Sequence, residues 1–446
     1  MPDQKNAQNS NKFNYKFNHN FYLILFFLIM LGFYSLEYFF RISPGLVLPE
    51  LMQQYDIGPL GIAYFSSFFY FGYVIFQIPS GLLLDKISTK WPLALLLFLS
   101  SLFFIVFLNI HSFWLGALIR FLIGGLSSIS FIAVLFFARK LLKSNWLTFI
   151  SGLAISIGSL AASFIQTINA LLMPYFPWQM TLTLFSTWGI LLAVLLALIP
   201  KVIYPKPQNQ NKIKNKIKNK NNLFKKIGSL LRTQNFLSNA LLGGLIFSPT
   251  SLLTAVWGVS FFELTHHMKA PEASFMIFLI FLGWAIGAPL FGLCVFLIKK
   301  NFNQLNIQSF VLCLLLGFIF LASIFWFLIL YAHLKNLLWL WVFLFGFCSS
   351  AQVLIWTRFD HICPKNLSGL GIATTNMIIM FLLGLIHGVF GHVIQGKAGH
   401  LTQKNHSVLL LNSHEILRGL SWSGLCFALS LIIILSALIF NLRKTL

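Results

Sequence analysis

The chain has 446 residues, of which 58% are hydrophobic and only 9% are charged, and its formal net charge is +22 at pH 7. Soluble domains devote about a quarter of their residues to charge, so this composition excludes an ordinary water-soluble globular protein. A basic excess can also indicate nucleic-acid binding, so the placement of the basic residues has to be considered.

Twelve long apolar stretches follow one another along the chain, each long enough for a helix across a lipid bilayer, which needs about 20 residues. The stretches are apolar on all sides, whereas membrane barrels have short segments of alternating polarity, so we expect helices. The first stretch is too long for a cleavable signal peptide and lacks a small-residue cleavage site. The predicted spans are 21–46, 59–84, 92–110, 113–138, 147–172, 180–199, 237–262, 272–298, 308–332, 337–357, 367–395 and 416–440.

The basic residues are divided unequally between the two sides of the membrane that twelve helices define. The two tails and the loops on their side hold 24 of the 31 Lys and Arg residues, the opposite side holds six, and Arg120 lies inside a span. Cytoplasmic loops carry the excess of Lys and Arg, so both termini are predicted to be cytoplasmic. The same rule accounts for the net charge, and no nucleic-acid partner is expected.

The densest basic run, Lys201–Arg232, separates the sixth and seventh spans and contains ten basic residues and no acid. We interpret it as a flexible linker that lies against anionic lipid headgroups. The sequence thus predicts an all-α integral membrane protein with two six-helix units. Its parts are a cytoplasmic polar tail (1–20), an N-terminal bundle (21–199), the basic linker (200–236), a C-terminal bundle (237–440) and a short cytoplasmic tail (441–446).

Two spans of the first half contain buried charges. Glu37 precedes Arg41 by four residues, a spacing that puts both side chains on one helix face, where pairing lowers the cost of burial. Two interpretations stay open: a structural pair at the outer rim, or a functional pair in a transport pathway. Arg120, in the fourth span, is costly unless it is paired or faces water, so we expect it to be functional or structurally bonded.

A charged signature follows the second span and consists of Gly81, Asp85, Lys86, Ser88 and Lys90. We expect Gly81 to allow a close helix approach, and an Asp at a helix end beside basic residues can hold two halves together through charge pairs. A simple cluster of charges at a helix end is the alternative. The Pro and Gly of this region recur in the eighth span, but the acid does not.

This signature resembles the loop between helices 2 and 3 of the major facilitator superfamily. The resemblance implies two pseudo-symmetric six-helix bundles and a gating role for Gly81, Asp85, Lys86 and Lys90. The segment from Arg41 to Pro49 is similar to the organic-anion and phthalate-type symporters of that superfamily. In those relatives an Arg eight residues before the Pro contacts the substrate carboxylate, which implies that Arg41 is an anion ligand and that Glu37 is the proton carrier.

In the second half, the sequence around Trp257 and Trp284 resembles uptake carriers of intracellular bacteria, whose relatives import amino acids from the phagosome. Each Trp stands beside Gly in a helix expected to border the central cavity, and both are predicted to contact substrate. Asn376 is the predicted polar ligand of the eleventh span. For His387 and His392 in the same span we favour a packing role, with pH sensing as the alternative.

We therefore predict a secondary active transporter of the bacterial inner membrane that imports a small carboxylate-bearing nutrient, an amino acid or an organic anion, by alternating access with proton coupling. A siderophore or metabolite transporter, for uptake or export, is the first alternative, and a non-transporting membrane sensor is an alternative of another class. The expected partners are the substrate, protons and the lipid bilayer, and the expected oligomeric state is a monomer. The predicted site comprises Arg41, Arg120, Asn376, Trp257 and Trp284 for substrate, and Glu37 for the proton.

The sequence does not predict an enzyme, a metal site or a cofactor. Acids are sparse and the His residues are not clustered, so a catalytic constellation near one membrane face is not expected. The cysteines are scattered without metal-binding spacing and are interpreted as packing residues. They are Cys294, Cys313, Cys348, Cys363 and Cys426.

Overall fold

The structure is a computed structural model, and within the residues it describes, twelve helical spans are long and apolar enough to cross a membrane. The predicted all-α membrane fold with twelve spans is therefore confirmed. The described residues are 2–86, 90–134, 147–199, 220–233, 235–301, 306–332, 335–364, 367–395 and 413–445.

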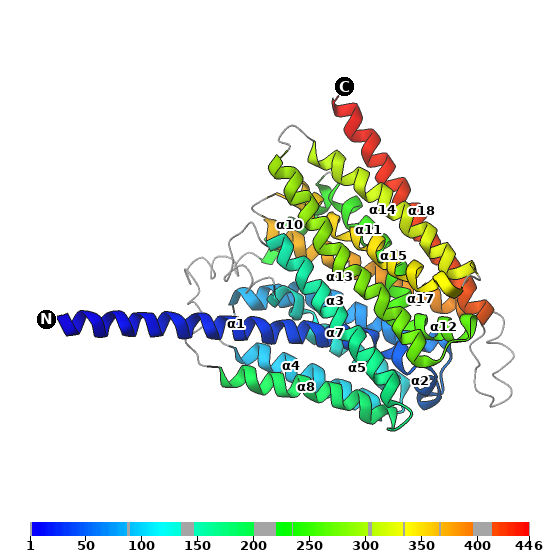
Figure 1. The fold of residues 1–446 in the computed structure, drawn as a ribbon, viewed down its shortest axis with the longest axis horizontal. Coiled ribbons are helices and arrows are strands. Elements are labelled where there is room, and N and C mark those ends of the chain that lie inside the picture. Colours follow the sequence, from blue (N-terminus) through cyan, green and yellow to red (C-terminus); the bar gives the residue numbers. More distant parts are fainter. Residues whose placement is uncertain are drawn as a thin grey trace.

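The first half supplies six of these spans, and α1 extends well beyond the bundle toward the N-terminus (Figure 1). The span that begins with α5 continues to Val134. A short helix, α2 (Leu48–Tyr55), follows α1. The spanning helices are α1 (Pro2–Leu46), α3 (Pro59–Lys86), α4 (Trp91–Asn109), α5 (Phe113–Ser127), α7 (Leu147–Leu172) and α8 (Trp178–Leu198).

In the second half, two of the spans change helix type near their middle. The seventh contains a π-helical turn and the tenth a 3-10 turn, and a second 3-10 turn, η4 (Lys335–Leu337), precedes the tenth. The spans are α11 (Phe236–Leu252) with η3 (Leu253–Trp257) and α12 (Gly258–His266), α13 (Ala270–Asn301), α14 (Ile307–Tyr331), α15 (Leu338–Ser349) with η5 (Ser350–Val353) and α16 (Leu354–Ile362), α17 (Ser368–Gln395), and α18 (Ser413–Thr445).

Within each half, glycines bring the second and fourth spans into backbone contact. A Cβ on Gly72 of α3 would lie 1.9 Å from the Phe121 oxygen of α5, and one on Gly124 of α5 would lie 2.0 Å from the Phe69 oxygen of α3. The equivalent helices of the second half, α13 and α15, meet in the same way, since a Cβ on Gly346 would lie 2.2 Å from the Ile280 oxygen. Small residues that allow such approaches are typical of membrane helix interfaces.

The outer helix pairs repeat this symmetry. In the first half α4 packs against α8, and in the second half α14 packs against α18. The two pairs lie on opposite sides of the molecule (Figure 1). The second and fourth, and the third and sixth, helices of each half are thus paired alike, as two pseudo-symmetric bundles require.

The two halves are packed together at the end of the molecule where α1 ends and α3 begins, which we call the α2 end. A Cβ on Gly45 of α1 would lie 2.7 Å from the Val256 backbone of η3, and one on Gly391 of α17 would lie 2.3 Å from the Ala63 Cβ of α3. Ser67 Oγ of α3 also donates to the Gly384 oxygen of α17 at 2.8 Å. The α2 end is therefore closed.

Helix α2 supports this end by capping α4. The last carbonyls of a helix have no intrahelical partner. Tyr55 Oη donates to the Phe107 oxygen at 2.6 Å, and Gln54 Nε2 donates to the Ile110 oxygen at 2.6 Å. The side chains of α2 thus satisfy carbonyls at and just beyond the carboxyl end of α4.

Tyr55→Phe keeps the ring, which stacks on Phe107, and removes only the hydroxyl. We expect the free energy of unfolding to fall by about 1 kcal/mol, the usual net contribution of one hydrogen bond, with the fold retained. Thermal unfolding of the purified protein measures the change. An unchanged midpoint would mean that water replaces the hydroxyl at the Phe107 carbonyl.

Part of the predicted linker forms a helix, α10 (Lys220–Arg232). Leu230 is fully buried and packs with Phe236, Phe359 and Cys363, whereas Lys225, Lys226 and Arg232 are exposed. One apolar face and one basic face are typical of a helix at a membrane surface. For these residues the interpretation as a flexible segment was wrong, because Leu230 gains a buried apolar site; residues 200–219 lie outside the described part of the chain.

Candidate substrate-binding site

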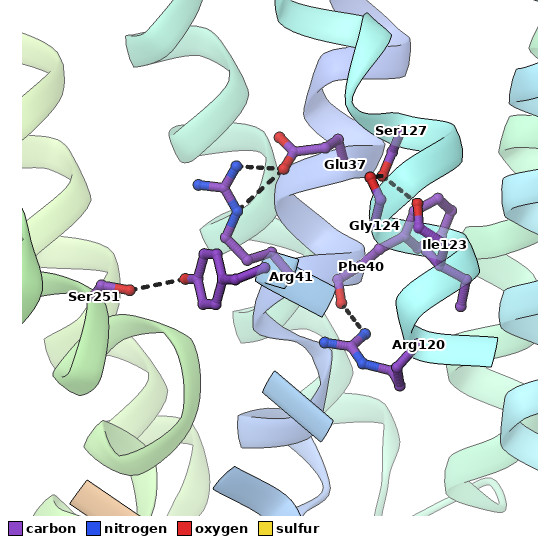
Figure 2. Close-up of polar contacts among 9 residues, drawn as sticks. Glu37, Phe40, Arg41, Arg120, Ile123, Gly124, Ser127 and Ser251 are labelled. Carbon is purple, nitrogen blue, oxygen red and sulfur yellow. Dashed lines mark hydrogen bonds and ion pairs between the residues drawn. The ribbon is translucent and has the colours of Figure 1, made fainter. Parts of the chain in front are cut away.

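Glu37 and Arg41 of α1 form a buried ion pair, as their four-residue spacing predicted (Figure 2). Arg41 Nε donates to Glu37 Oε1 at 3.1 Å, and Arg41 Nη2 donates to the same oxygen. Glu37 is 0% exposed and Arg41 is 4% exposed, so both charges are removed from solvent. Glu37 Oε2 is buried without a partner among the described residues, which leaves an acceptor available to a proton or a ligand.

Three tyrosine rings surround the Arg41 guanidinium. Its Cζ lies 4.6 Å from the ring centroid of Tyr38, on α1, and 5.8 Å from those of Tyr70 and Tyr73, on α3. A cation within about 6 Å of an aromatic ring is attracted to it, more strongly where water is excluded. The rings therefore stabilise the buried cation and hold it in place.

The second half reaches this cluster through α11 and α17. Tyr70 Oη is 2.9 Å from Ser251 Oγ of α11, and Ser251 Oγ is 3.2 Å from His387 Nε2 of α17. Asn376 of α17 lies close enough to Tyr73 to interact with its hydroxyl group, although its Nδ2 has no hydrogen-bond partner among the described residues. Of the predicted residues, Glu37, Arg41 and Asn376 thus lie around Tyr73.

Arg120 of α5 is fully buried but binds backbone carbonyls instead of a carboxylate. Its Nη1 donates to the Phe40 oxygen at 2.5 Å (Figure 2). Its Nε donates to the Phe65 oxygen at 3.3 Å. Phe40 lies four residues before Pro44, which has no N–H, so its carbonyl lacks the usual helical donor. Arg120 and the Ser43 hydroxyl, which donates at 2.9 Å, therefore share the carbonyl that the proline leaves free. The Arg120 Nη2 has no partner in the described structure.

The two predicted tryptophans lie in different environments. Trp284 Nε1 donates to Ser349 Oγ at 2.8 Å, so its polar atom is already bonded within the second half. Trp257 is fully buried, packs against Phe390 and ends the π-helical turn η3, and its Nε1 has no partner in the described part of the chain. Single π-helical turns are frequent at functional sites. Trp257 is thus the tryptophan with an unused donor.

The predicted gating residues are described only in part. Lys90 Nζ donates to the Ala197 and Ile199 oxygens at the carboxyl end of α8, where a cation is favourable, so this contact is within one half. A Cβ on Gly81 would meet nothing within 4 Å among the described residues, so these residues do not show the close helix approach expected there. The side chains of Asp85 and Lys86 and the whole of Ser88 lie outside the described structure, so their roles stay predictions.

Sequence reasoning did not predict Ser251 or the three rings around Arg41, those of Tyr38, Tyr70 and Tyr73, which we call the tyrosine cage. A signal was present, since Tyr70 and Tyr73 are three residues apart and therefore share one helix face, and Tyr38 is three residues before Arg41. Ser251 carries no such signal, because its partners come from other helices.

Comparison with known proteins agrees with this architecture. Residues 21–388 match the Major Facilitator Superfamily. The chain is 25% identical over 319 residues to the uncharacterized transporter YybO of Bacillus subtilis (strain 168), an alignment that covers 66% of this chain and 71% of that protein.

Solved structures share the fold. A bacterial homologue of the human lysosomal transporter Spinster, in an inward-facing and unoccupied conformation, superposes with a TM-score of 0.71 and 13% identity, covering 95% of this chain and 98% of that chain. The nucleoside transporter NupG gives a TM-score of 0.61 and 12% identity, covering 92% and 99% of the two chains. The chain therefore belongs to the Major Facilitator Superfamily and is a multi-pass membrane transporter.

Proposed function

We propose that this transporter imports a small carboxylate-bearing nutrient, an amino acid or an organic anion, with protons as the driving ion. The observation that carries the proposal is the buried Arg41, whose only described charged partner is a carboxylate on the same helix. A substrate carboxylate can replace Glu37 on the guanidinium, since both are planar acceptors suited to its fork of donors.

Proton coupling follows from that exchange. When a substrate takes Arg41, Glu37 is left in a buried site without its cation, and a carboxyl group there favours the neutral form. The unpartnered Oε2 is the atom at which the proton would be held. Substrate and proton would therefore be bound together, as a symporter requires.

The proposed setting is the bacterial inner membrane, with both termini in the cytoplasm. The excess of Lys and Arg on the side of the termini supports this orientation. The α2 end would then face the outside, and its closed contacts would correspond to an inward-facing state. Alternating access requires the two halves to separate at this end to admit substrate.

A panel of labelled small carboxylates and their carboxamides, offered to proteoliposomes that contain the purified protein, tests the substrate class. We expect uptake of one or more carboxylates and none of the matching carboxamides, because a neutral amide cannot replace Glu37 on Arg41. Equal uptake of an acid and its amide would contradict a carboxylate-binding site. Transport of none of the carboxylates would favour the siderophore or metabolite alternative.

Glu37→Gln is expected to remove the response to a proton gradient while exchange of substrate across the membrane continues. Glutamine has almost the same shape and still offers an oxygen to Arg41, but it cannot take a proton. Uptake by proteoliposomes with and without an acidic outer solution measures the response. A gradient dependence that survives in this variant would place the coupling proton elsewhere.

Glu50→Gln is the matched control. Glu50 lies on α2, outside the spans, where burial raises the pKa of its carboxyl, and its Oε2 has no partner among the described residues. It is therefore a second protonatable carboxylate at a different place. We expect this variant to keep the gradient dependence of the parent protein.

A further inference from the structure

We propose that Tyr70, Ser251 and His387 form a latch between the two halves that holds the α2 end closed. The latch joins α3 of the first half to α11 and α17 of the second. It rests on the alternating-access part of the proposed function, and it is independent of the substrate.

The geometry of the three residues carries the proposal. Besides its hydrogen bond to Ser251, the Tyr70 ring is stacked on the His387 ring, with centroids 5.3 Å apart and an interplanar angle of 29°. All three side chains are buried, and His387 is 0% exposed. Polar groups in such a site are costly unless they are bonded to one another, so the chain of contacts is a strong constraint on how the halves meet.

The backbone around the latch is shaped to bring these residues together. A Cβ on Gly384 of α17 would lie 3.1 Å from the Tyr70 Cβ, so α17 approaches α3 closely just before His387. Ser67, one turn before Tyr70, donates to the Gly384 oxygen across the same interface. When the α2 end opens, α3 has to leave α11 and α17, and both the hydrogen bond and the ring stack have to break.

The latch also borders the candidate substrate site. The Tyr70 ring that bonds Ser251 is one of the rings around Arg41, at 5.8 Å from its Cζ. Movement of Arg41 on substrate binding therefore acts directly on a member of the latch. This contact gives a physical route from the site to closure of the α2 end.

Labelling of a reporter cysteine tests the latch without any substrate. The five native cysteines are first replaced, and Ser67→Cys is introduced as a nearly isosteric reporter, since Ser67 is 3% exposed in the closed interface. The parent protein and every variant carry this change, so the weakened bond to the Gly384 oxygen is common to all of them. A membrane-impermeant maleimide is then added to the outside of intact cells, and the rate of labelling is measured. Slow labelling reports a closed α2 end.

Tyr70→Phe keeps the ring beside Arg41 and His387 and removes only the latch hydroxyl. We expect it to raise the labelling rate about fivefold, as the loss of one net hydrogen bond predicts. Ser251→Ala removes this bond and also the contact with His387 Nε2, so it should raise the rate at least as much. Adding Tyr70→Phe to Ser251→Ala should change nothing further, because the Tyr70 hydroxyl has then already lost its partner. Ser251→Thr retains a hydroxyl and should restore slow labelling.

Tyr55→Phe is the control, because its hydroxyl bonds Phe107 within the first half. It should leave the labelling rate unchanged. Unchanged labelling in Tyr70→Phe and Ser251→Ala, or an equal rise in Tyr55→Phe, would overturn the latch. If one of the two latch variants does not fold, the labelling rate of the other variant tests the latch. A failure of the carboxylate proposal would appear only in the uptake panel, so the two results are separable.

Discussion

Arg41→Ala is expected to reduce uptake by at least about 100-fold, since removing one member of a buried charged pair costs several kcal/mol. The variant loses the cation that would bind the substrate carboxylate, and no other described side chain offers a guanidinium inside the tyrosine cage. Initial rates in proteoliposomes, normalised to inserted protein, measure the loss. Arg41→Lys keeps a charge without the planar fork and should retain a small part of the activity.

A double variant separates the role of Arg41 in stability from its role in transport. In Arg41→Ala the Glu37 carboxyl is buried without a partner, and we expect the free energy of unfolding to fall by about 3 kcal/mol. Adding Glu37→Gln removes the unpaired charge and should recover much of that stability. Uptake should stay lost, whereas recovered uptake in the double variant would show that the pair is structural.

Arg120→Leu is expected to lower the free energy of unfolding by about 3 kcal/mol and to abolish uptake through misfolding. The change leaves the buried Phe40 carbonyl with the Ser43 hydroxyl as its only described donor, removes the bond to the Phe65 carbonyl and empties the space of a buried side chain. Thermal unfolding and the yield of folded protein measure the effect. Normal stability in this variant would mean that Arg120 is free for substrate.

Pro44→Ala provides a specific rescue. Alanine at this position restores an N–H that can bond the Phe40 carbonyl within α1. In the Arg120→Leu background we therefore expect Pro44→Ala to recover about 1 kcal/mol. A rescue that restores uptake together with stability would assign Arg120 a purely structural role, and stable protein without uptake would place its free Nη2 in the substrate site.

The fold was predictable because the bilayer imposes strong constraints on sequence. Each span needs about 20 apolar residues, and all twelve predicted stretches correspond to spans of the structure. Breaks within a span have no comparable signal: the π-helical turn Leu253–Trp257 is a change of one turn inside a continuous apolar run. Helix α10 was missed because it lies at the end of the densest basic run of the chain, although Leu230 sits on an apolar face.

The site was predictable only where its parts are close in sequence. Glu37 and Arg41 are four residues apart, and that spacing alone indicated their pairing. The contact of Tyr70 with Ser251 joins residues 181 positions apart in different halves, so one sequence contains no trace of it. The partners of Arg120 are backbone carbonyls, and the only hint was Pro44, four residues after Phe40.

The contacts of Lys90 could not be predicted from the motif that contains it. The loop signature predicted a gating role for Lys90, and its described hydrogen bonds are with the carboxyl end of α8, which the motif does not specify. For Gly81, the motif predicted a close helix approach that the described residues do not show. Motifs identify the family more reliably than they identify the contacts of each member.

The most direct test of the account is accumulation of a carboxylate substrate in proteoliposomes under an inward proton gradient. Proton-coupled import predicts that the wild-type protein concentrates the substrate above its outside level. Collapsing the gradient with a protonophore should then release the excess. Glu37→Gln should only equilibrate the substrate, and Arg41→Ala should not transport it. Accumulation by both variants at the wild-type level would contradict a transport site built on the Glu37–Arg41 pair.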